Sequence, residues 1–479
     1  MDFFTGISRH FVPLPVTAWL ACGFIALVLV IYILNNRRRL LIRLPGPPSG
    51  RWTTGHFPEI TGVYGVEFQR QLVSDYGPTM MLNGAFGEEL IFTVDPVAIQ
   101  TIFVKDKSKF ERAEGAARLI RSVFGGGLLG MTGEEHRMHR KLLNPVFTSK
   151  FLRELVITSM PLFMDIAKQT CQGIKQELAS AKNTANEIDI FHWTASAALE
   201  LIGEAGLGYS FNSFGGERNE YYYAVKSVMQ VLTKVTPFMP ILPYLYRFGT
   251  PSFRRWVLKY IPWGPVQRLR YAVSMQNAQA EEVLRARQAL ISSGVDLSSL
   301  VGRGRDIMTL LMKANMEEGS GFRIDRQAMV GHMNTAIAHI LDMVANHQDV
   351  QERLRLELTQ YFKSNPDDSY HEGLIELPYL DAVVRETLRL HGPVSFLTRV
   401  CKQDTTIPLS DPIETPSGKI TSIPVKKGTR IMMSVIMSNR YEKIWGERGH
   451  EFLPQRWIGN KLDGVTQTGV QLPGVYSSM

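Results

Sequence analysis

Residues 385–393 read Arg-Glu-Thr-Leu-Arg-Leu-His-Gly-Pro and close a helix that is predicted to begin near Leu377. Glu386 and Arg389 are three residues apart, so a helix places them on one face. The apolar residues around them predict that this face is buried. Losing one member of a buried ion pair costs about 3–5 kcal/mol, because the other charge is left uncompensated. The alternative is a solvent-facing pair worth about 0.2–0.5 kcal/mol, and Glu-x-x-Arg alone does not decide between the two.

A second motif, Phe-Leu-Pro-Gln-Arg-Trp, occupies residues 452–457 after a region of strand-like runs punctuated by Pro and Gly. It supplies another arginine, Arg456, beside aromatic residues. Together, Glu-x-x-Arg and Phe-x-Pro-x-Arg-Trp resemble the motifs of the cytochrome P-450 family, the haem-thiolate monooxygenases, in its microsomal fungal type. In that family one glutamate and two arginines lock a structural core beneath the haem. The resemblance assigns this triad to Glu386, Arg389 and Arg456.

The resemblance extends from the hinge near residue 44 to Trp457 and implies a mainly α fold with small β-sheets (α+β). It implies haem as the cofactor and insertion of one oxygen atom from dioxygen into a lipophilic small molecule, as in secondary metabolism. It also implies NADPH–cytochrome P-450 reductase as the electron-donating partner. A hydrophobic share of 44% and a charged share of 20% are ordinary for a globular protein. Nothing divides the 479 residues clearly, so one large domain behind an anchor is expected.

The expected anchor is residues 15–34, PVTAWLACGFIALVLVIYIL, which carry no charge and are long enough to span a hydrocarbon core of ~30 Å. Arg37, Arg38 and Arg39 follow the run, and positive charge on that side is typical of a cytosolic flank. A cleaved signal peptide fits less well, because the run is long and its basic flank follows it. We therefore expect a single-pass anchor at residues 1–36, a basic and proline-rich hinge at 37–50, and a cytosolic domain at 51–479 on the endoplasmic reticulum membrane.

Charge and cysteine usage exclude several classes of protein. The net charge of +8 suits an anionic membrane face or an acidic protein partner, whereas no basic-aromatic patch indicates nucleic acid binding. Cys22, Cys171 and Cys401 are the three cysteines, and no two of them have metal-ligand spacing. The chain is thus not a disulfide scaffold, and a reducing compartment is expected.

Three further residues are candidates for contact with the haem propionates. His136 and Arg140 are four apart on a helix predicted over residues 133–145, so they share a face. The family places similar residues against one propionate, and a guanidinium suits a carboxylate because it can bind both oxygens. Arg399, in the strand-like run 396–400, matches the arginine that often meets the second propionate. The alternatives are a solvated basic helix face for His136 and a surface strand arginine for Arg399.

Two catalytic elements that the resemblance implies are missing from the sequence. The family's helix over the haem carries a threonine cluster that relays protons to oxygen, but residues 331–341 read Gly-His-Met-Asn-Thr-Ala-Ile-Ala-His-Ile-Leu. The lead-in up to Thr335 and the exit from Ala336 match the family, and the cluster between them is absent. The family's cysteine loop would follow the point where the sequence stops at Met479. We therefore assign no catalytic residue and no metal ligand, and we expect an incomplete haem-monooxygenase domain.

Three interpretations follow. The first is a monooxygenase by descent that is inactive as written, because of a misplaced exon boundary, a lost C-terminal exon or a pseudogene. The second is a non-catalytic, membrane-tethered remnant or pseudoenzyme that binds lipids or protein partners. The third is haem ligation through His332 or His339.

Local patterns predict the remaining elements. Strands are expected at residues 80–82 and 90–94, and a hairpin with a Lys-Gly turn at 423–431. Amphipathic helices are expected from residue 150 to about 300, with an interrupted, proline-broken helix at 238–263 that could form a lid on the membrane. A long helix is expected from Asp325 to about Asn346.

Overall fold

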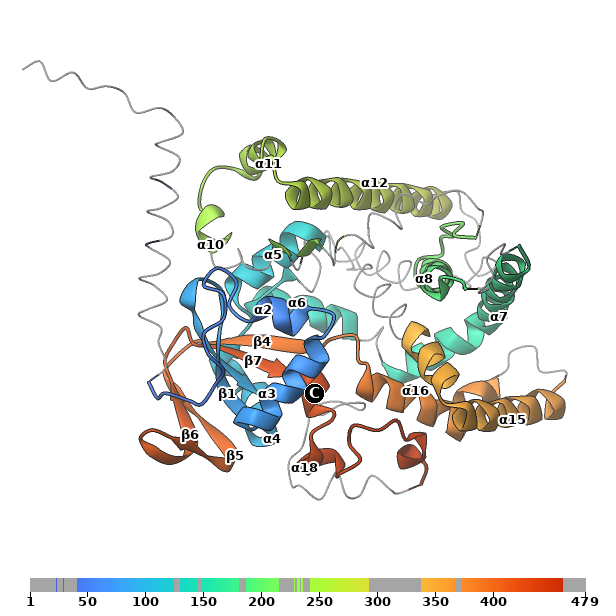
Figure 1. Cartoon of the computed structure of the whole chain (residues 1–479). Helices are drawn as coiled ribbons and strands as arrows, with labels where there is room; N and C mark the ends of the chain where they lie inside the picture. The colour runs from blue at the N-terminus through green and yellow to red at the C-terminus, as the bar shows by residue number, and fades with distance from the viewer. Residues whose placement is uncertain are drawn as a thin grey trace, which may run out of the picture.

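The computed structural model describes residues 41–124, 130–144, 148–180, 187–214, 242–292, 337–366 and 372–459, together with isolated positions between residues 23 and 235. Within these ranges helices predominate and the strands form two small sheets, as the predicted α+β class requires (Figure 1). The helices are α2 (Phe57–Thr61), α3 (Gly65–Tyr76), α4 (Pro96–Gln100), α5 (Glu114–Phe124), α6 (Gly133–Leu143), α7 (Ser149–Ser180), α8 (Ile190–Leu201), α10 (Leu242–Leu245), α11 (Pro251–Lys259), α12 (Gly264–Ser292), α15 (Gln348–Ser364), α16 (Pro378–Leu390), α17 (Val435–Ser438) and α18 (Glu442–Trp445).

The larger sheet joins the two halves of the chain in the order β1-β2-β7-β4-β3. Its strands are β1 (Thr79–Asn83), β2 (Glu89–Thr93), β3 (Phe110–Glu111), β4 (Phe396–Cys401) and β7 (Arg430–Ser434). β2 pairs parallel with β7, and every other pairing in this sheet is antiparallel. Residues far apart in the sequence therefore lie side by side in the sheet.

The predicted hairpin over residues 423–431 is wrong. The Lys-Gly turn is present, with Gly428 at a φ of 90°, but the strands on either side of it join different sheets. β6 (Gly418–Val425) pairs with β5 (Thr405–Thr415), whereas β7 pairs with β2 and β4. The long-range partners of β7 outweigh the local turn signal.

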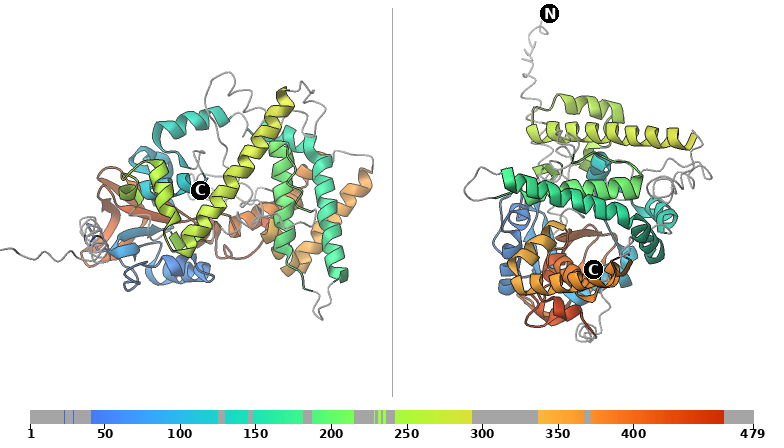
Figure 2. Two further views of the ribbon diagram at one scale, coloured as in Figure 1. Left: turned by 90° about the horizontal axis from the view of Figure 1, so that it is seen from above. Right: turned by 90° about the vertical axis from the view of Figure 1, so that its right-hand side faces the viewer.

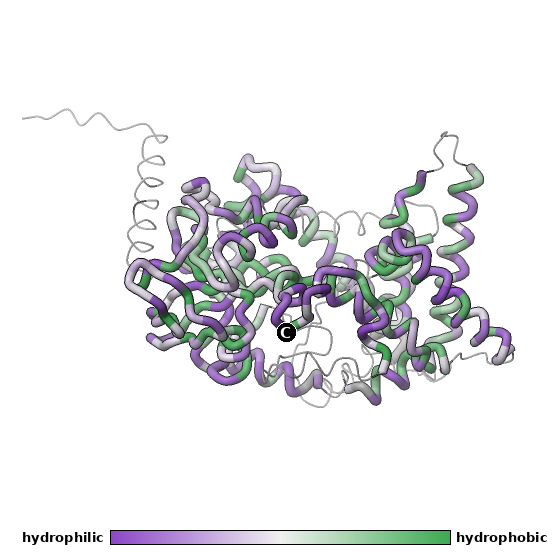
Figure 3. Tube along the Cα trace, turned by 60° about the horizontal axis from the view of Figure 1, so that its bottom comes forward, coloured by the Kyte–Doolittle hydropathy of each residue, from purple (hydrophilic) through white to green (hydrophobic). Residues whose placement is uncertain are grey.

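The core lies on both faces of the larger sheet because successive side chains of a strand point to opposite faces. On β2, Ile91 packs with Ile431 and Met433 in one buried cluster, while its neighbours Leu90 and Phe92 belong to a second cluster. The alternation of hydrophobic and hydrophilic residues along the chain can be followed in Figure 3.

The described part of the proline-rich hinge packs against this sheet. Leu44 is buried, and the backbone N–H of Met81 donates to the carbonyl of Pro45 at 2.8 Å. A Cβ at Gly46 would lie 2.2 Å from the Met81 carbonyl oxygen, so only glycine allows this approach. The predicted anchor, by contrast, lies outside the described residues apart from Gly23 and Leu29. Among the residues that the structure does describe, no helix has the length and apolar character needed to cross a bilayer.

Helices α7, α8 and α12 lie largely to one side of the two sheets (Figure 2). The segment 238–263 is broken as predicted, with α10 and α11 as its described helical pieces, and α12 follows it directly from Gly264. Residues 337–346 are helical, and the first part of the helix expected from Asp325 lies outside the described residues.

Candidate functional site

Helix α16 positions the first motif. Pro378 occupies its first turn, where a missing N–H costs nothing. The carboxylate of Glu357, on α15, accepts hydrogen bonds from the backbone N–H groups of Tyr379 and Leu380, both at 2.9 Å. The negative charge of Glu357 therefore satisfies two free donors at the positive end of the helix. Tyr379 and other apolar residues bury the face that also carries Glu386 and Arg389.

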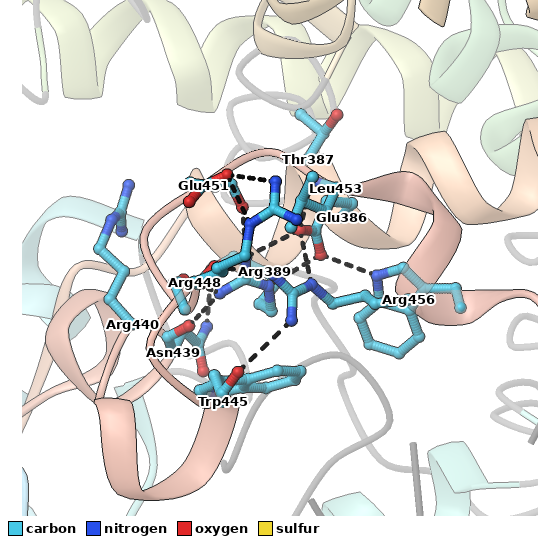
Figure 4. Close-up of polar contacts among 12 residues, drawn as sticks. Glu386, Thr387, Arg389, Asn439, Arg440, Trp445, Arg448, Glu451, Leu453 and Arg456 are labelled. Carbon is cyan, nitrogen blue, oxygen red and sulfur yellow. Dashed lines mark hydrogen bonds and ion pairs between the residues drawn. The ribbon is translucent and has the colours of Figure 1, made fainter. Parts of the chain in front are cut away.

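Glu386 lies at the centre of a buried hydrogen-bonded network, shown in Figure 4, and its side chain is 0% exposed. Oε1 accepts from Nη2 of Arg389 at 2.8 Å, from Nε of Arg456 at 2.9 Å and from the backbone N–H of Leu453 at 2.9 Å. Oε2 accepts from Nε of Arg389 and from Nε1 of Trp457, both at 2.8 Å. Five donors thus surround one carboxylate.

Arg389 is also 0% exposed and uses its whole guanidinium group. Besides the two bonds to Glu386, Nη1 donates to the carbonyls of Asn439 at 2.5 Å and Gly449 at 2.6 Å, and Nη2 donates to the carbonyl of Glu451 at 3.0 Å. These five bonds match the five N–H donors that an arginine carries. The guanidinium is therefore satisfied without water.

Arg456 completes the attachment of residues 439–451 to α16. Its Nη2 donates to the carbonyl of Arg448 at 2.9 Å, and its side chain is 15% exposed. Asn439 in turn donates from Nδ2 to the carbonyl of Arg389 at 2.9 Å. The two arginines hold this segment through its backbone carbonyls, and those contacts do not depend on which side chains the segment carries.

The network sets the charge of Glu386. Burial alone raises the pKa of this carboxyl group, but the hydrogen bonds and charge of Arg389, the Leu453 N–H and the charge of Arg456 outweigh burial and lower the pKa. Burial lowers the pKa of Arg389, and Glu386 partly offsets that effect. Glu386 is therefore ionised in the fold, as a carboxylate shared by two cations must be.

A second group of residues, here called the cationic cluster, consists of three arginines and one histidine: Arg112, Arg140, Arg399 and His136. Burial lowers the pKa of His136, and the positive charges of Arg140, Arg112 and Lys107 lower it further. Burial also lowers the pKa of Arg399, followed by the charge of Arg112. Arg140 is exposed on α6. Burial removes water from these groups, and their positive charges repel one another. A bound anion would offset both effects.

Arg399 is held in place from its own strand. Its guanidinium lies 4.7 Å from the ring centroid of Phe103, and Nη1 donates to the carbonyl of Thr398 at 2.9 Å. Arg112 was not among the residues predicted from the sequence. It follows β3, which pairs with β4 through Phe110 and Cys401, and only this long-range pairing brings Arg112 to Arg399. No local motif carries that information.

The two described cysteines lie in different surroundings. Cys171 is exposed on α7. Cys401 is buried on β4, its S–H donates to the carbonyl of Gln403 at 2.9 Å, and burial raises the pKa of its thiol. Across the described ranges, no group of three or more His, Cys, Asp or Glu residues could hold a metal ion.

Of the two histidines considered as haem ligands, only His339 lies among the described residues. His332 lies outside the described residues, as does Thr335. The ring of His339 stacks on that of His391 with centroids 4.7 Å apart, at the C-terminal end of α16. Burial lowers the pKa of His339, which therefore stays neutral in this stack.

Comparison with known proteins identifies the class. A family model described as Cytochrome P-450 matches residues 45–469. Cytochrome P-450 monooxygenase 91 of Postia placenta is 35% identical over 475 residues, which cover 94% of this chain and 86% of the relative. Ganoderic acid synthetase of Ganoderma lucidum is 32% identical over 464 residues, which cover 92% of this chain and 82% of the relative. The chain belongs to the cytochrome P-450 family, whose cofactor is haem.

Proposed function

We propose that this chain is the scaffold of a haem-dependent monooxygenase that oxidises a lipophilic small molecule. The observation that carries the proposal is the presence in one fold of the cationic cluster and the buried Glu386–Arg389–Arg456 network. Haem carries two carboxylates, and Arg112, His136, Arg140 and Arg399 are the residues that would bind them. Guanidinium groups suit this role because each can donate to both oxygens of a carboxylate.

Haem bound to a thiolate supplies the activation of dioxygen in this family. The residues of this chain bind and orient: the cationic cluster neutralises the propionates, and the Glu386 network fixes residues 439–451 against α16. The proposed domain spans residues 51–479. Residues 331–341 lack the threonine cluster that the family carries, so we propose that residues 1–479 alone do not complete the reaction.

We also propose that the domain lies on a membrane, behind a single-pass anchor at residues 1–36 and a hinge at 37–50. Residues 221–280 contain eight lysines and arginines and no Asp or Glu. Within that stretch α11 has no buried residue, and Phe253, Trp256 and Tyr260 are 50%, 53% and 69% exposed. Basic and exposed aromatic residues on one short helix favour the surface of an anionic bilayer, such as the cytosolic face of the endoplasmic reticulum. Electrons would come from NADPH–cytochrome P-450 reductase on the same membrane.

Haem titration of the full chain in detergent tests the cofactor site. Arg399→Gln and Arg140→Gln should each weaken haem binding about ten-fold, because each removes a charged hydrogen-bond donor to a propionate. Arg137→Gln is the matched control, since Arg137 lies on the same helix but is 81% exposed and pairs with Glu134. Equal haem affinity in all three variants and the unmodified chain would refute the proposed site.

A further inference from the structure

The hydrogen-bond donors to Glu386 include one that the arginine motifs do not account for. Nε1 of Trp457 donates to Oε2 at 2.8 Å, as short as the bonds from Arg389. Oε1 has three donors, whereas Oε2 has Nε of Arg389 and this indole N–H. Without Trp457, one carboxylate oxygen would rely on a single donor.

Two neighbouring side chains contact the indole ring of Trp457. The guanidinium of Arg385 lies 5.9 Å from its ring centroid, and the Trp445 ring centroid lies 6.0 Å from it. The Arg389 guanidinium lies 4.8 Å from the centroid of the Trp445 ring. The Trp457 ring is therefore packed beside the Glu386–Arg389 ion pair, and this packing restricts the direction of its N–H group.

We propose that Trp457 is a positioning residue and the fourth member of the network. Its indole N–H fixes the orientation of the Glu386 carboxylate, and this orientation sets where Arg389 and Arg456 hold residues 439–451. A tryptophan that only filled space would need no donor directed at a buried carboxylate. The role of Trp457 in orienting Glu386 is independent of the proposed function. Only the use of the network to support a haem site rests on that proposed function.

The neighbouring Trp445 provides a matched control. Its side chain is buried, whereas that of Trp457 is half-buried, and its Nε1 has no hydrogen-bond partner within the described part of the chain. Replacing either tryptophan by phenylalanine keeps an aromatic ring and removes one N–H. The two substitutions therefore differ mainly in whether that N–H binds Glu386.

Urea unfolding of the full chain at a series of pH values tests the proposal without haem. Trp457→Phe should raise the unfolding equilibrium constant at pH 7 about ten-fold, the effect of losing a hydrogen bond to a charged group. Because the pKa of Glu386 is lowered in the fold, its stabilising contribution is lost as pH falls through that pKa. Losing a donor raises that pKa, so Trp457→Phe should lose stability at a higher pH than the unmodified chain.

The pH dependence of unfolding distinguishes a positioning role of Trp457 from a role in packing alone. Trp445→Phe should leave the pH of acid unfolding unchanged, whatever it does to stability at pH 7. An unshifted acid profile in Trp457→Phe, or an equal shift in both variants, would overturn the proposal. If Trp457→Phe does not fold, NMR of the unmodified chain decides: one indole N–H resonance should shift as Glu386 takes up its proton, and the absence of such a shift would refute the assignment.

Discussion

At the scale of single residues, Arg389 shows why the motif needs an arginine inside the fold. All five N–H donors of this side chain are used, two on Glu386 and three on backbone carbonyls. A lysine has three donors and no planar fork, so it cannot reproduce this set. The group is stable without water because each donor has an acceptor.

Replacing Arg389 should therefore destabilise the protein strongly. Arg389→Leu is expected to lower the free energy of unfolding by about 3–5 kcal/mol, because it leaves a buried carboxylate short of charge and three carbonyls without donors. Urea denaturation measures this loss. Arg385→Leu is the control on the same helix: the Arg385–Asp381 pair is partly exposed, at 31% and 44%, and should be worth about 1 kcal/mol or less. Similar losses for both variants would contradict this account.

His391 predicts a pH dependence of stability. Burial, followed by the charges of His339 and Arg440, lowers the pKa of His391 from 6.5 to about 4. The folded state therefore binds fewer protons than the unfolded chain between these two values, and stability should fall as pH drops through that window. His391→Phe keeps a ring against His339 and should reduce this slope, as followed by unfolding at several pH values. The exposed His450 is the control, and equal slopes for His391→Phe and His450→Gln would refute the explanation.

At the scale of elements, α16 illustrates what sequence can and cannot supply. The spacing of Glu386 and Arg389 on a helix, and the start of that helix near Leu377, follow from local periodicity. The cap from Glu357 does not, because no pattern within α16 shows that a carboxylate of α15 lies over its first turn. Arg112 was missed for the same reason, since the β3–β4 pairing places it, and so was the separation of β6 from β7.

The cap predicts a measurable effect on stability. Glu357→Ala should lower the free energy of unfolding by about 1 kcal/mol, because two N–H groups at the start of α16 lose their acceptor. Glu352→Ala, at an exposed position of the same helix, should change stability little. Thermal or urea unfolding compares the two, and an equal effect would show that the cap contributes nothing specific.

At the scale of the whole molecule, the larger sheet joins residues 89–93 to residues 430–434, and it carries Arg399 on the strand between β7 and β3. The sequence could predict the α+β class because the two motifs, each weak alone, are specific to one family when they occur together at this spacing. The proposed membrane contact belongs to the same scale, since α11 lies at the outer edge of the molecule (Figure 1) and has no buried residue.

Membrane contact by α11 can be followed in the full chain reconstituted into anionic vesicles. Lipids that carry a quencher in their chains should reduce the fluorescence of Trp256, so Trp256→Phe should remove part of the quenching. Trp445→Phe, at a buried residue, should leave the quenching unchanged. Quenching that is the same in Trp256→Phe as in the unmodified chain would place α11 away from the bilayer.

The most direct test of the account is the reduced, carbon-monoxide spectrum of residues 1–479 loaded with haem. The account places the proposed propionate-binding residues and the Glu386 network in these residues, with Cys171 exposed on α7 and the pKa of the buried Cys401 thiol raised by burial. It therefore predicts that haem binds, dependent on Arg140 and Arg399, without the Soret band of thiolate ligation. A thiolate Soret band, or haem binding that ignores both arginines, would contradict it.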